Sequence, residues 1–287
     1  MQEHGRIAES GAALTPVART AYYCCILRAD DAASTHPVCG DALAARFLDA
    51  GIRRELLPAT RIAPPAASNV ARHRLIDDLV RHSLSRNADR RVLVVGAGFD
   101  TRAFRMAGGR WWEFDEGALL AAKETRLPAA DAPNPLTRVA VDFERESMAA
   151  PLARVAGDDA ALVILEGVSM YVPDEGLREL ALAVRRSLPH ATLVCDLMSP
   201  AFARRFGGPL RRELAKLGAT FALRARHPSP IFEGAGYAAA HCLSIVERAR
   251  EARTLRIPRW LLATLLRELR DGYAVWVFVP PQIPDRT

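Results

Sequence analysis

The segment Arg91–Arg102, with the sequence RVLVVGAGFDTR, constrains the fold more than any other part of the chain. Three of the four apolar residues from Val92 to Val95 are β-branched, which predicts a fully buried strand that is too short to be a helix. Gly96 and Gly98 end this strand, and a helix is expected to begin near Asp100. Glycine lets the backbone approach a ligand closely, and the first turn of a helix presents unpaired N–H groups. The segment therefore predicts a nucleotide-binding turn between a strand and a helix.

The residues after the glycines indicate which nucleotide this turn would hold. Thr101 occupies the position of the third glycine in the dinucleotide fingerprint GxGxxG. The carboxylate of Asp100 would repel a pyrophosphate, but it would attract a ligand with an ammonium and a sulfonium group. The turn thus favours S-adenosylmethionine over NAD. The alternative is that Asp100 serves only as the N-cap of the helix.

The composition excludes several classes of function. The net charge of +6 comes mostly from arginines interspersed with acids, and only 7% of the residues are aromatic, so a small anionic substrate is compatible and nucleic acid is not an expected partner. No apolar run approaches the length of a membrane span, and residues 1–11 lack the apolar core of a secretory signal. We therefore expect a cytoplasmic protein with no membrane partner. The five cysteines lack metal-ligand spacing, so reduced thiols and no bound metal are expected.

Hydrophobic periodicity predicts helices before the glycine segment and a strand–helix alternation from that segment onward. Two helices at 15–30 and 41–50 are followed by a break from Pro58 to Pro65 and by a long helix at 66–85. Further strands are expected at 110–114, 137–141, 161–165, 191–196, 242–248 and 273–279. Helices are expected from 100 and at 116–126, 147–155, 174–188, 201–217 and 259–270. Repeated βα units indicate an α/β fold with a parallel sheet.

Three acids stand at the predicted carboxyl ends of successive strands, where ligands bind in open α/β sheets. Asp115 is placed to accept both hydroxyl groups of a ribose, Asp142 to accept from an adenine amine, and Glu166 to lie near a methionine ammonium. Arg72, or alternatively Arg74, would meet the methionine carboxylate. Each acid alone could be a solvated strand end or a helix cap. Their succession along one edge, beside the glycine turn, is what indicates a cofactor site.

Four motifs together resemble the leucine carboxyl methyltransferase family, in the branch of bacterial secondary-metabolite O-methyltransferases. They are VVGAGFDTR at 94–102, WEFD at 112–115 with Lys123, VDF at 141–143, and LEGVSMYV at 165–172. The resemblance extends from about Thr20 to Asp196 and implies S-adenosylmethionine as cofactor and S-adenosylhomocysteine as product. The implied cofactor residues are Arg72, Gly96, Asp115, Asp142, Phe143 and Glu166, to which the glycine turn adds Gly98. The family usually has a proline where this chain has Gly117, so a looser turn is expected there.

The resemblance also implies the architecture, a class I methyltransferase-like Rossmann fold with a mostly parallel seven-stranded sheet in a single domain. Residues 1–65 are expected to form an N-terminal helical cap, and residues 66–196 the cofactor-binding core. Residues 197–240, which are rich in arginine and broken by proline and glycine, are expected to form a helical lid before the C-terminal strands in 241–287. The cap and the lid together would cover the cofactor.

The resemblance implies direct methyl transfer from the sulfonium to a carboxylate or hydroxyl oxygen of a small molecule. A carboxylate is ionised at pH 7 and needs no base, so no catalytic residue is assigned. Tyr22, Tyr23 and Tyr171 are candidates for acceptor contacts, and packing is the alternative for each. Arg211 and Arg224 are candidates for holding an acidic acceptor, with a solvated helix face as the alternative. Further arginines of the same insertion are Arg204, Arg205, Arg212 and Arg226.

Other functions are compatible with the same sequence. His227 and His241 could act as bases toward a hydroxyl acceptor. The layered fold also suits an NAD-dependent oxidoreductase, although Asp100 and Thr101 argue against one. A binding protein without turnover, and methylation of a protein's C-terminal carboxylate, are further alternatives.

Overall fold

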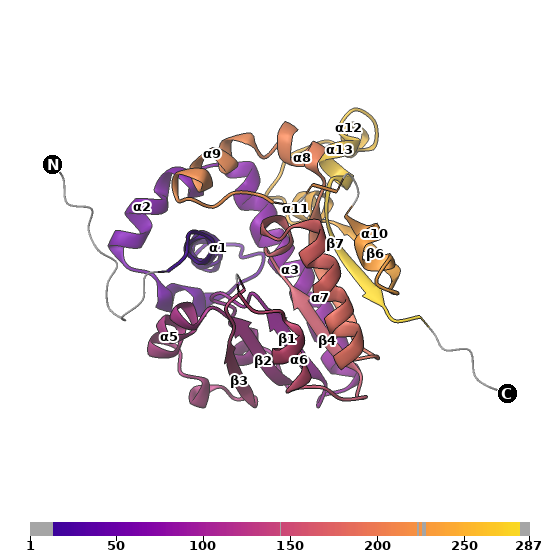
Figure 1. The fold of residues 1–287 in the computed structure, drawn as a ribbon. Coiled ribbons are helices and arrows are strands. Elements are labelled where there is room, and N and C mark those ends of the chain that lie inside the picture. Colours follow the sequence, from indigo (N-terminus) through magenta and orange to yellow (C-terminus); the bar gives the residue numbers. More distant parts are fainter. Residues whose placement is uncertain (1–13, 144, 223, 226–227, 282–287) are drawn as a thin grey trace.

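The computed structural model describes residues 14–143, 145–222, 224–225 and 228–281 (Figure 1). Its centre is a seven-stranded sheet in the order β3-β2-β1-β4-β5-β7-β6. Strands β1 to β5 pair in parallel, and β7 runs antiparallel to both β5 and β6. The strands are β1 Arg91–Val95, β2 Arg110–Asp115, β3 Leu136–Ala140, β4 Ala161–Leu165, β5 Thr192–Met198, β6 Ala238–Ser244 and β7 Tyr273–Val279. The predicted α/β fold with a mostly parallel sheet is confirmed.

Helices precede and connect these strands. Before β1 lie α1 Pro16–Ala32, the 3-10 helix Ala42–Phe47, α2 Ala50–Thr60 and α3 Ala63–Arg86. Between β1 and β5 lie α4 Arg102–Arg105, α5 Gly117–Arg126, α6 Ala149–Ala153 and α7 Asp174–Ser187, with 3-10 turns at Ala129–Asp131 and Ser169–Tyr171. After β5 lie α8 Pro200–Arg205, α9 Gly208–Lys216, α10 Ser229–Glu233, α11 Ile245–Glu251, α12 Arg259–Ala263 and α13 Arg267–Asp271. Within the described ranges, no helix combines the length and apolar character needed to cross a membrane.

Strand β1 contributes to the two largest hydrophobic cores of the molecule. All five of its residues are buried, as its apolar run predicts. Val92 and Val94 contribute to the core beneath α3, whereas Leu93 and Val95 contribute to the core beneath α7. Successive residues of a strand point to opposite faces, so one short apolar strand supports a helical layer on each side of the sheet. These layers are visible in Figure 1, where α6 and α7 lie in front of the sheet and α3 behind it.

The glycine turn after β1 is covered by the N-terminal helices. The Phe99 ring packs against Tyr22 of α1 and against Phe47, with ring centroids 4.5 and 4.7 Å apart. Gly96 and Gly98 have φ angles of +67° and +48°, in the left-handed region that residues with a Cβ rarely adopt. The two glycines therefore let the chain turn sharply beneath α1, as the sequence predicts.

The predicted break from Pro58 to Pro65 is wrong in its extent. Helix α2 continues through Pro58 to Thr60, and α3 already begins at Ala63. Pro58 is exposed on α2, and the helix continues although the proline has no backbone N–H to donate. Pro64 and Pro65 lie in the first turn of α3, where backbone N–H groups have no partner within the helix. Only residues 61–62 separate the two helices.

The predicted strand at 242–248 is also wrong, because β6 ends at Ser244 and α11 begins at once. The Ser244 hydroxyl accepts a hydrogen bond from the backbone N–H of Glu247 at 3.2 Å and caps this helix. The sequence Ser-x-x-Glu at 244–247 is a capping pattern that marks the start of a helix. Two predicted helices are each divided in two, 201–217 into α8 and α9 and 259–270 into α12 and α13, and the one at 41–50 is a 3-10 helix.

The glycine turn yields a prediction about stability. A Cβ on Gly96 would lie 2.3 Å from Cγ2 of Val168. The substituted residue would also have to adopt a left-handed φ angle. We expect Gly96→Ala to lower the free energy of unfolding by about 2 kcal/mol or more, which corresponds to a fall in Tm of at least about 4 °C. The measurement is thermal unfolding followed by circular dichroism.

Gly117→Ala is the matched control for that variant. Gly117 is the first residue of α5, and its added Cβ would make an ordinary contact of 3.6 Å with Ala140. Alanine at such a position should leave Tm unchanged or raise it slightly, because it restricts the unfolded chain. Equal Tm values for wild type and Gly96→Ala would show that the turn does not need glycine.

Candidate functional site

The structure brings the predicted glycine turn and acids to the same edge of the sheet. Gly96 follows β1, Asp115 ends β2, Asp142 follows β3 and Glu166 follows β4. These four strands are parallel neighbours, and the strand order reverses between β1 and β4. Ligands of open α/β sheets bind outside the carboxyl ends of the strands at such a reversal. The placement of the candidate residues is therefore the one that a cofactor site on this fold requires.

Asp115 is a buried acid without a cationic partner. Its two carboxylate oxygens accept hydrogen bonds from the backbone N–H groups of Gly98 at 2.6 Å and Glu116 at 2.7 Å. Within the described ranges, no arginine, lysine or histidine nitrogen lies within 4.0 Å of it. Burial raises the pKa of Asp115 to about 6, against the effects of the two backbone N–H groups and of the more distant charge of Lys123. Each oxygen retains a lone pair, so the carboxylate can accept two further hydrogen bonds from a ligand.

Glu166, in contrast, is surrounded by two guanidinium groups and an imidazole. Its carboxylate lies 2.7 Å from Nη2 of Arg102, 3.2 Å from Nε of Arg72 and 3.1 Å from Nδ1 of His73. Burial opposes ionisation of Glu166, but His73, Arg102 and Arg72 together hold its pKa well below the usual value. Glu166 is thus ionised and held rigidly at the end of β4.

Arg72 links this acid to the next two strands of the sheet, β5 and β7. Its Nη1 lies 3.2 Å from the Asp196 carboxylate of β5 and donates to the hydroxyl of Tyr273 in β7 at 2.7 Å. Its Nη2 has a single hydrogen-bond contact within the described ranges, the sulfur of Cys24 at 3.7 Å. That nitrogen keeps donor capacity for a carboxylate. Arg74 instead pairs with Asp78 at 2.8 Å and is half-exposed, so it does not share this environment.

These ion pairs belong to one continuous buried network that runs from α1 to β7. Arg102 is its centre, because this fully buried guanidinium contacts Asp77, Asp100 and Glu166 at 2.5–2.7 Å. The buried acids among the described residues are Asp41, Asp77, Asp100, Glu166 and Asp196, and the arginines are Arg28, Arg72, Arg102 and Arg105. Burial and then Arg102 lower the pKa of His73, which favours its neutral form, and Arg81 at the surface also pairs with Asp77 at 3.3 Å.

Asp100 requires a correction to the sequence-based argument about the nucleotide. Its carboxylate accepts from the Arg102 backbone N–H at 2.7 Å and from the Arg102 guanidinium at 2.5 Å. The Asp100 charge is therefore offset locally, and the interpretation as a residue that organises the start of α4 is the one the structure supports.

The three candidate tyrosines differ in their surroundings. Tyr22 packs into the apolar cluster around Phe99, so it is a core residue. Burial raises the pKa of Tyr23, and within the described ranges its hydroxyl has no hydrogen-bond partner. Tyr171 follows the Glu166 loop and packs edge-on against Phe221 at 5.5 Å, and burial raises the pKa of its hydroxyl. Within the described ranges, the Tyr23 hydroxyl has no partner, so it can still donate to a ligand.

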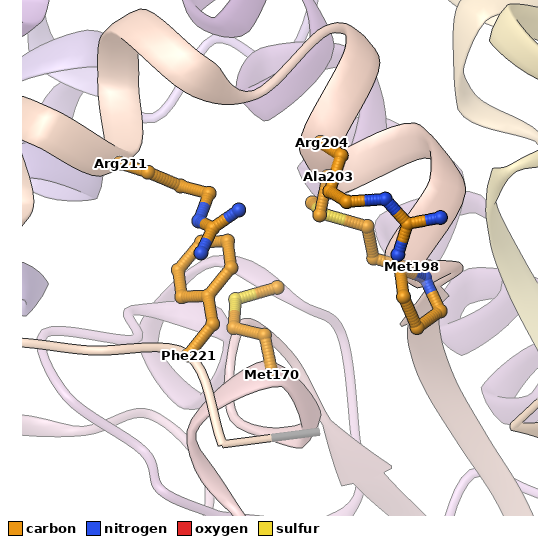
Figure 2. Close-up of a pocket in the computed structure, with 7 residues that line it drawn as sticks. Met170, Met198, Ala203, Arg204, Arg211 and Phe221 are labelled. Atoms are coloured by element: carbon orange, nitrogen blue, oxygen red, sulfur yellow. The ribbon is translucent and has the colours of Figure 1, made fainter. Parts of the chain in front are cut away.

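Arg211 lines a cavity between the Glu166 loop and the insertion (Figure 2). The other lining residues are Met170, Met198, Pro200, Ala203, Arg204 and Phe221. Arg224 does not line it, and its backbone N–H donates to the Asp174 carboxylate at 2.9 Å. His241 is exposed on the edge strand β6. Arg226 and His227 lie outside the described residues.

Asp142 and Phe143 form an exposed corner after β3. The Asp142 side chain is 45% exposed and lies 3.7 Å from Nε of Arg145. Phe143 is 40% exposed, one of few large apolar side chains on the surface that the structure describes. An apolar ring beside a carboxylate at this edge suits contact with an adenine. The assignment of both residues to adenine stays a prediction.

Comparison with known proteins decides the family. The model of the leucine carboxyl methyltransferase family matches residues 21–184, more than half of the chain. This chain belongs to that family. A Frankia alni protein, provisionally named as an S-adenosyl-L-methionine-dependent methyltransferase, is 32% identical over 195 residues, which cover 61% of this chain and 65% of that protein. For three curated relatives with names of this kind, the matched segments span 43–65% of their own lengths.

Solved structures support the fold of this family member. A DUF574 family protein from Streptomyces avermitilis has a TM-score of 0.61 at 17% identity, covering 88% of this chain and 99% of that one. Magnesium protoporphyrin IX methyltransferase from Synechocystis, solved with bound S-adenosylhomocysteine, has a TM-score of 0.50 at 11% identity, covering 84% and 99%. The chain therefore has a class I methyltransferase-like Rossmann fold, as expected.

The buried network yields a second prediction about stability. Arg102→Met leaves the carboxylates of Asp77, Asp100 and Glu166 without their shared partner. Because unpaired buried charges are costly, we expect the free energy of unfolding to fall by about 3–5 kcal/mol. Urea unfolding measures this loss.

Arg178→Met is the control for Arg102→Met. Arg178 also pairs with a carboxylate, that of Glu175 at 2.9 Å, but on the exposed surface of α7. Its loss should leave the urea midpoint unchanged, since water replaces the exposed partner. Equal effects of the two substitutions would show that the Arg102 network does not stabilise the fold.

Proposed function

We propose that this protein is an S-adenosylmethionine-dependent O-methyltransferase that methylates a small molecule, with a carboxylate oxygen as the acceptor. S-adenosylmethionine is the cofactor to which the family and the names of the curated relatives point. The resemblance to the secondary-metabolite branch supports a role in secondary metabolism. The charge distribution and the lack of a spanning helix in the described ranges are compatible with a cytoplasmic enzyme.

The observation that carries this proposal is the buried, unpaired carboxylate of Asp115. A buried acid is normally neutralised by a cation, as Asp77, Asp100 and Glu166 are in the same molecule. Asp115 keeps two free lone pairs at the edge of the sheet, which fit the two hydroxyl groups of a ribose. The desolvation that raises its pKa is offset when such hydroxyl groups donate to it.

The other candidate residues fit the methionyl part of the cofactor. S-adenosylmethionine carries a net charge of +1 near pH 7, from a sulfonium, an ammonium and a carboxylate. Glu166 is ionised within the buried network, so it can pair with the positively charged part of this ligand. Nη2 of Arg72 and the hydroxyl of Tyr23 are free to donate to the carboxylate, and Glu166 can face the ammonium.

The chemistry needs positioning more than proton transfer. When bound, S-adenosylmethionine supplies a methyl group on a positively charged sulfur. Asp115 and Arg72 would fix the two ends of the cofactor, which holds the reactive carbon in one place. No aspartate, glutamate or histidine lines the cavity beside Met170 among the described residues, and this favours an acceptor oxygen that is already ionised.

We further propose that the chain acts as one domain. The N-terminal cap (1–65) and the lid (197–240) close over the core (66–196), and residues 241–287 contain the remaining strands. Helix α9 contacts α2, and Pro16 of α1 lies close to Gly218 after α9. In Figure 1 these elements arch together over α1 on the side of the sheet edge. Such a cover would exclude water from the reacting atoms.

Cofactor binding should depend on the ionisation of Asp115. Since the carboxylate, and not the acid, accepts from both ribose hydroxyls, affinity should fall as the pH drops below the pKa of about 6. We expect S-adenosylhomocysteine to bind about tenfold more weakly near pH 5 than near pH 7.5. Isothermal titration calorimetry across this range measures the effect.

Asp115→Asn provides the control for this titration, with NADH as the control ligand. The variant should bind S-adenosylhomocysteine at least about tenfold more weakly at pH 7.5, with no further decrease toward pH 5, because the titrating group is gone. Tight binding of NADH by the wild type, or undiminished binding of S-adenosylhomocysteine by Asp115→Asn, would contradict the proposed cofactor site.

A further inference from the structure

A cavity of about 220 Å³ lies between the Glu166 loop and the first two helices of the insertion. Met170 of the Ser169–Tyr171 turn and Met198 at the end of β5 form one side of it. Arg204 of α8 and Arg211 of α9 reach it from the other side, as Figure 2 shows. Its volume is below the range of about 300–1,000 Å³ that is typical of drug-sized ligands, so it suits one ring with a short substituent.

The two arginines at this cavity lack carboxylate partners. Within the described ranges, no aspartate or glutamate oxygen lies within 4.0 Å of the guanidinium group of Arg204 or Arg211. Lys216, on the same helix as Arg211, is paired with Glu213 at 2.8 Å. Two unpaired guanidinium groups beside one cavity favour an anion there, and guanidinium geometry suits a carboxylate in particular.

The remaining surface of the cavity suits an aromatic ring. The Phe221 ring lies beneath the Arg211 guanidinium, 5.6 Å from centroid to Cζ, and Figure 2 shows Met170 next to it. Methionine side chains are adaptable and make favourable sulfur–aromatic contacts. An aromatic ring between Phe221, Met170 and Met198 would therefore have apolar contacts, while its acid group meets the arginines.

The cavity adjoins the proposed cofactor site through the loop that follows Glu166. Phe221 packs against Tyr171 at 5.5 Å, and the backbone N–H of Ala222 donates to the carbonyl of Met170 at 2.8 Å. Gly167 of the same loop lies against the Arg72 guanidinium, where an added Cβ would be 3.2 Å from Nη2. The same loop thus borders both the methionyl end of the proposed site and the cavity.

We propose that this cavity binds the methyl acceptor, and that the acceptor is a compact aromatic carboxylic acid whose carboxylate is held by Arg204 and Arg211. This inference rests on the proposed methyltransferase function. In the step, an oxygen of the carboxylate forms a bond to the methyl carbon while the carbon–sulfur bond breaks, and the sulfur keeps the electron pair. The products are a neutral methyl ester and S-adenosylhomocysteine, and no proton moves.

The arginines would also favour release of the product. The acid carries a charge that pairs with two guanidinium groups, whereas the methyl ester carries none. The site therefore binds substrate more tightly than product, and the amide and the ester of an aromatic acid serve as uncharged probes of nearly equal shape.

The test is calorimetric titration of the protein saturated with S-adenosylhomocysteine. The probes are benzoate, phenylacetate and trans-cinnamate, each with its amide and methyl ester, and hexanoate as an aliphatic acid. We expect an aromatic acid to bind at least tenfold more tightly than its amide, its ester and hexanoate. Arg204→Met and Arg211→Met should each weaken binding of that acid about tenfold and leave the amide unaffected. Lys216→Met, on the same helix, should bind every probe as the wild type does.

The outcomes separate this inference from the function on which it rests. Failure of the wild type to bind S-adenosylhomocysteine would overturn the proposed function. With S-adenosylhomocysteine bound normally, the acceptor assignment is overturned if no aromatic acid binds, if acids bind no better than amides, if hexanoate binds as tightly, or if Arg211→Met keeps full affinity. Detection by mass spectrometry of the methyl ester of the bound acid, formed with S-adenosylmethionine, would support the assignment directly.

Discussion

The buried guanidinium of Arg102 holds the candidate site together. It contacts acids from α3, the glycine turn and the end of β4, and the network continues through Arg72 to Asp196 of β5 and Tyr273 of β7. Elements far apart in sequence are thereby fixed against one another at the sheet edge. A network of this kind is costly to desolvate, so its value lies in the geometry that it imposes.

Asp115 shows the opposite arrangement at the same edge. It is buried, but it has only two backbone N–H partners and a pKa of about 6. Asp77, Asp100 and Glu166 have arginine partners, whereas Asp115 has only backbone N–H partners. The partners therefore distinguish the acids that the fold neutralises from the acid that remains available to a ligand. This contrast, and not the glycine turn alone, separates a ligand-binding carboxylate from a structural one.

Much of the fold could be predicted from local patterns. The apolar runs at 91–95, 161–165 and 273–279 predicted strands with the observed bounds. Such a run is too short for a buried helix and is rich in β-branched or aromatic residues, which favour a strand. The site was predictable only in part. Arg72 was expected near the methionine carboxylate and Glu166 near its ammonium. Their direct ion pair, and the contact of Glu166 with Arg102, depend on tertiary packing that no spacing in the sequence reveals. The Ser-x-x-Glu pattern at 244–247 predicts the helix cap at Ser244, but the hydrophobic periodicity predicted a strand there.

The central claim is that Asp115 and the Arg72–Glu166 pair hold the two ends of S-adenosylmethionine at the sheet edge. A crystal structure of the protein with S-adenosylhomocysteine tests it most directly. We predict both ribose hydroxyls within hydrogen-bond distance of the Asp115 carboxylate, and the methionyl carboxylate within hydrogen-bond distance of Arg72 Nη2. A ribose bound away from Asp115, or a methionyl group that does not reach Arg72, would contradict the account.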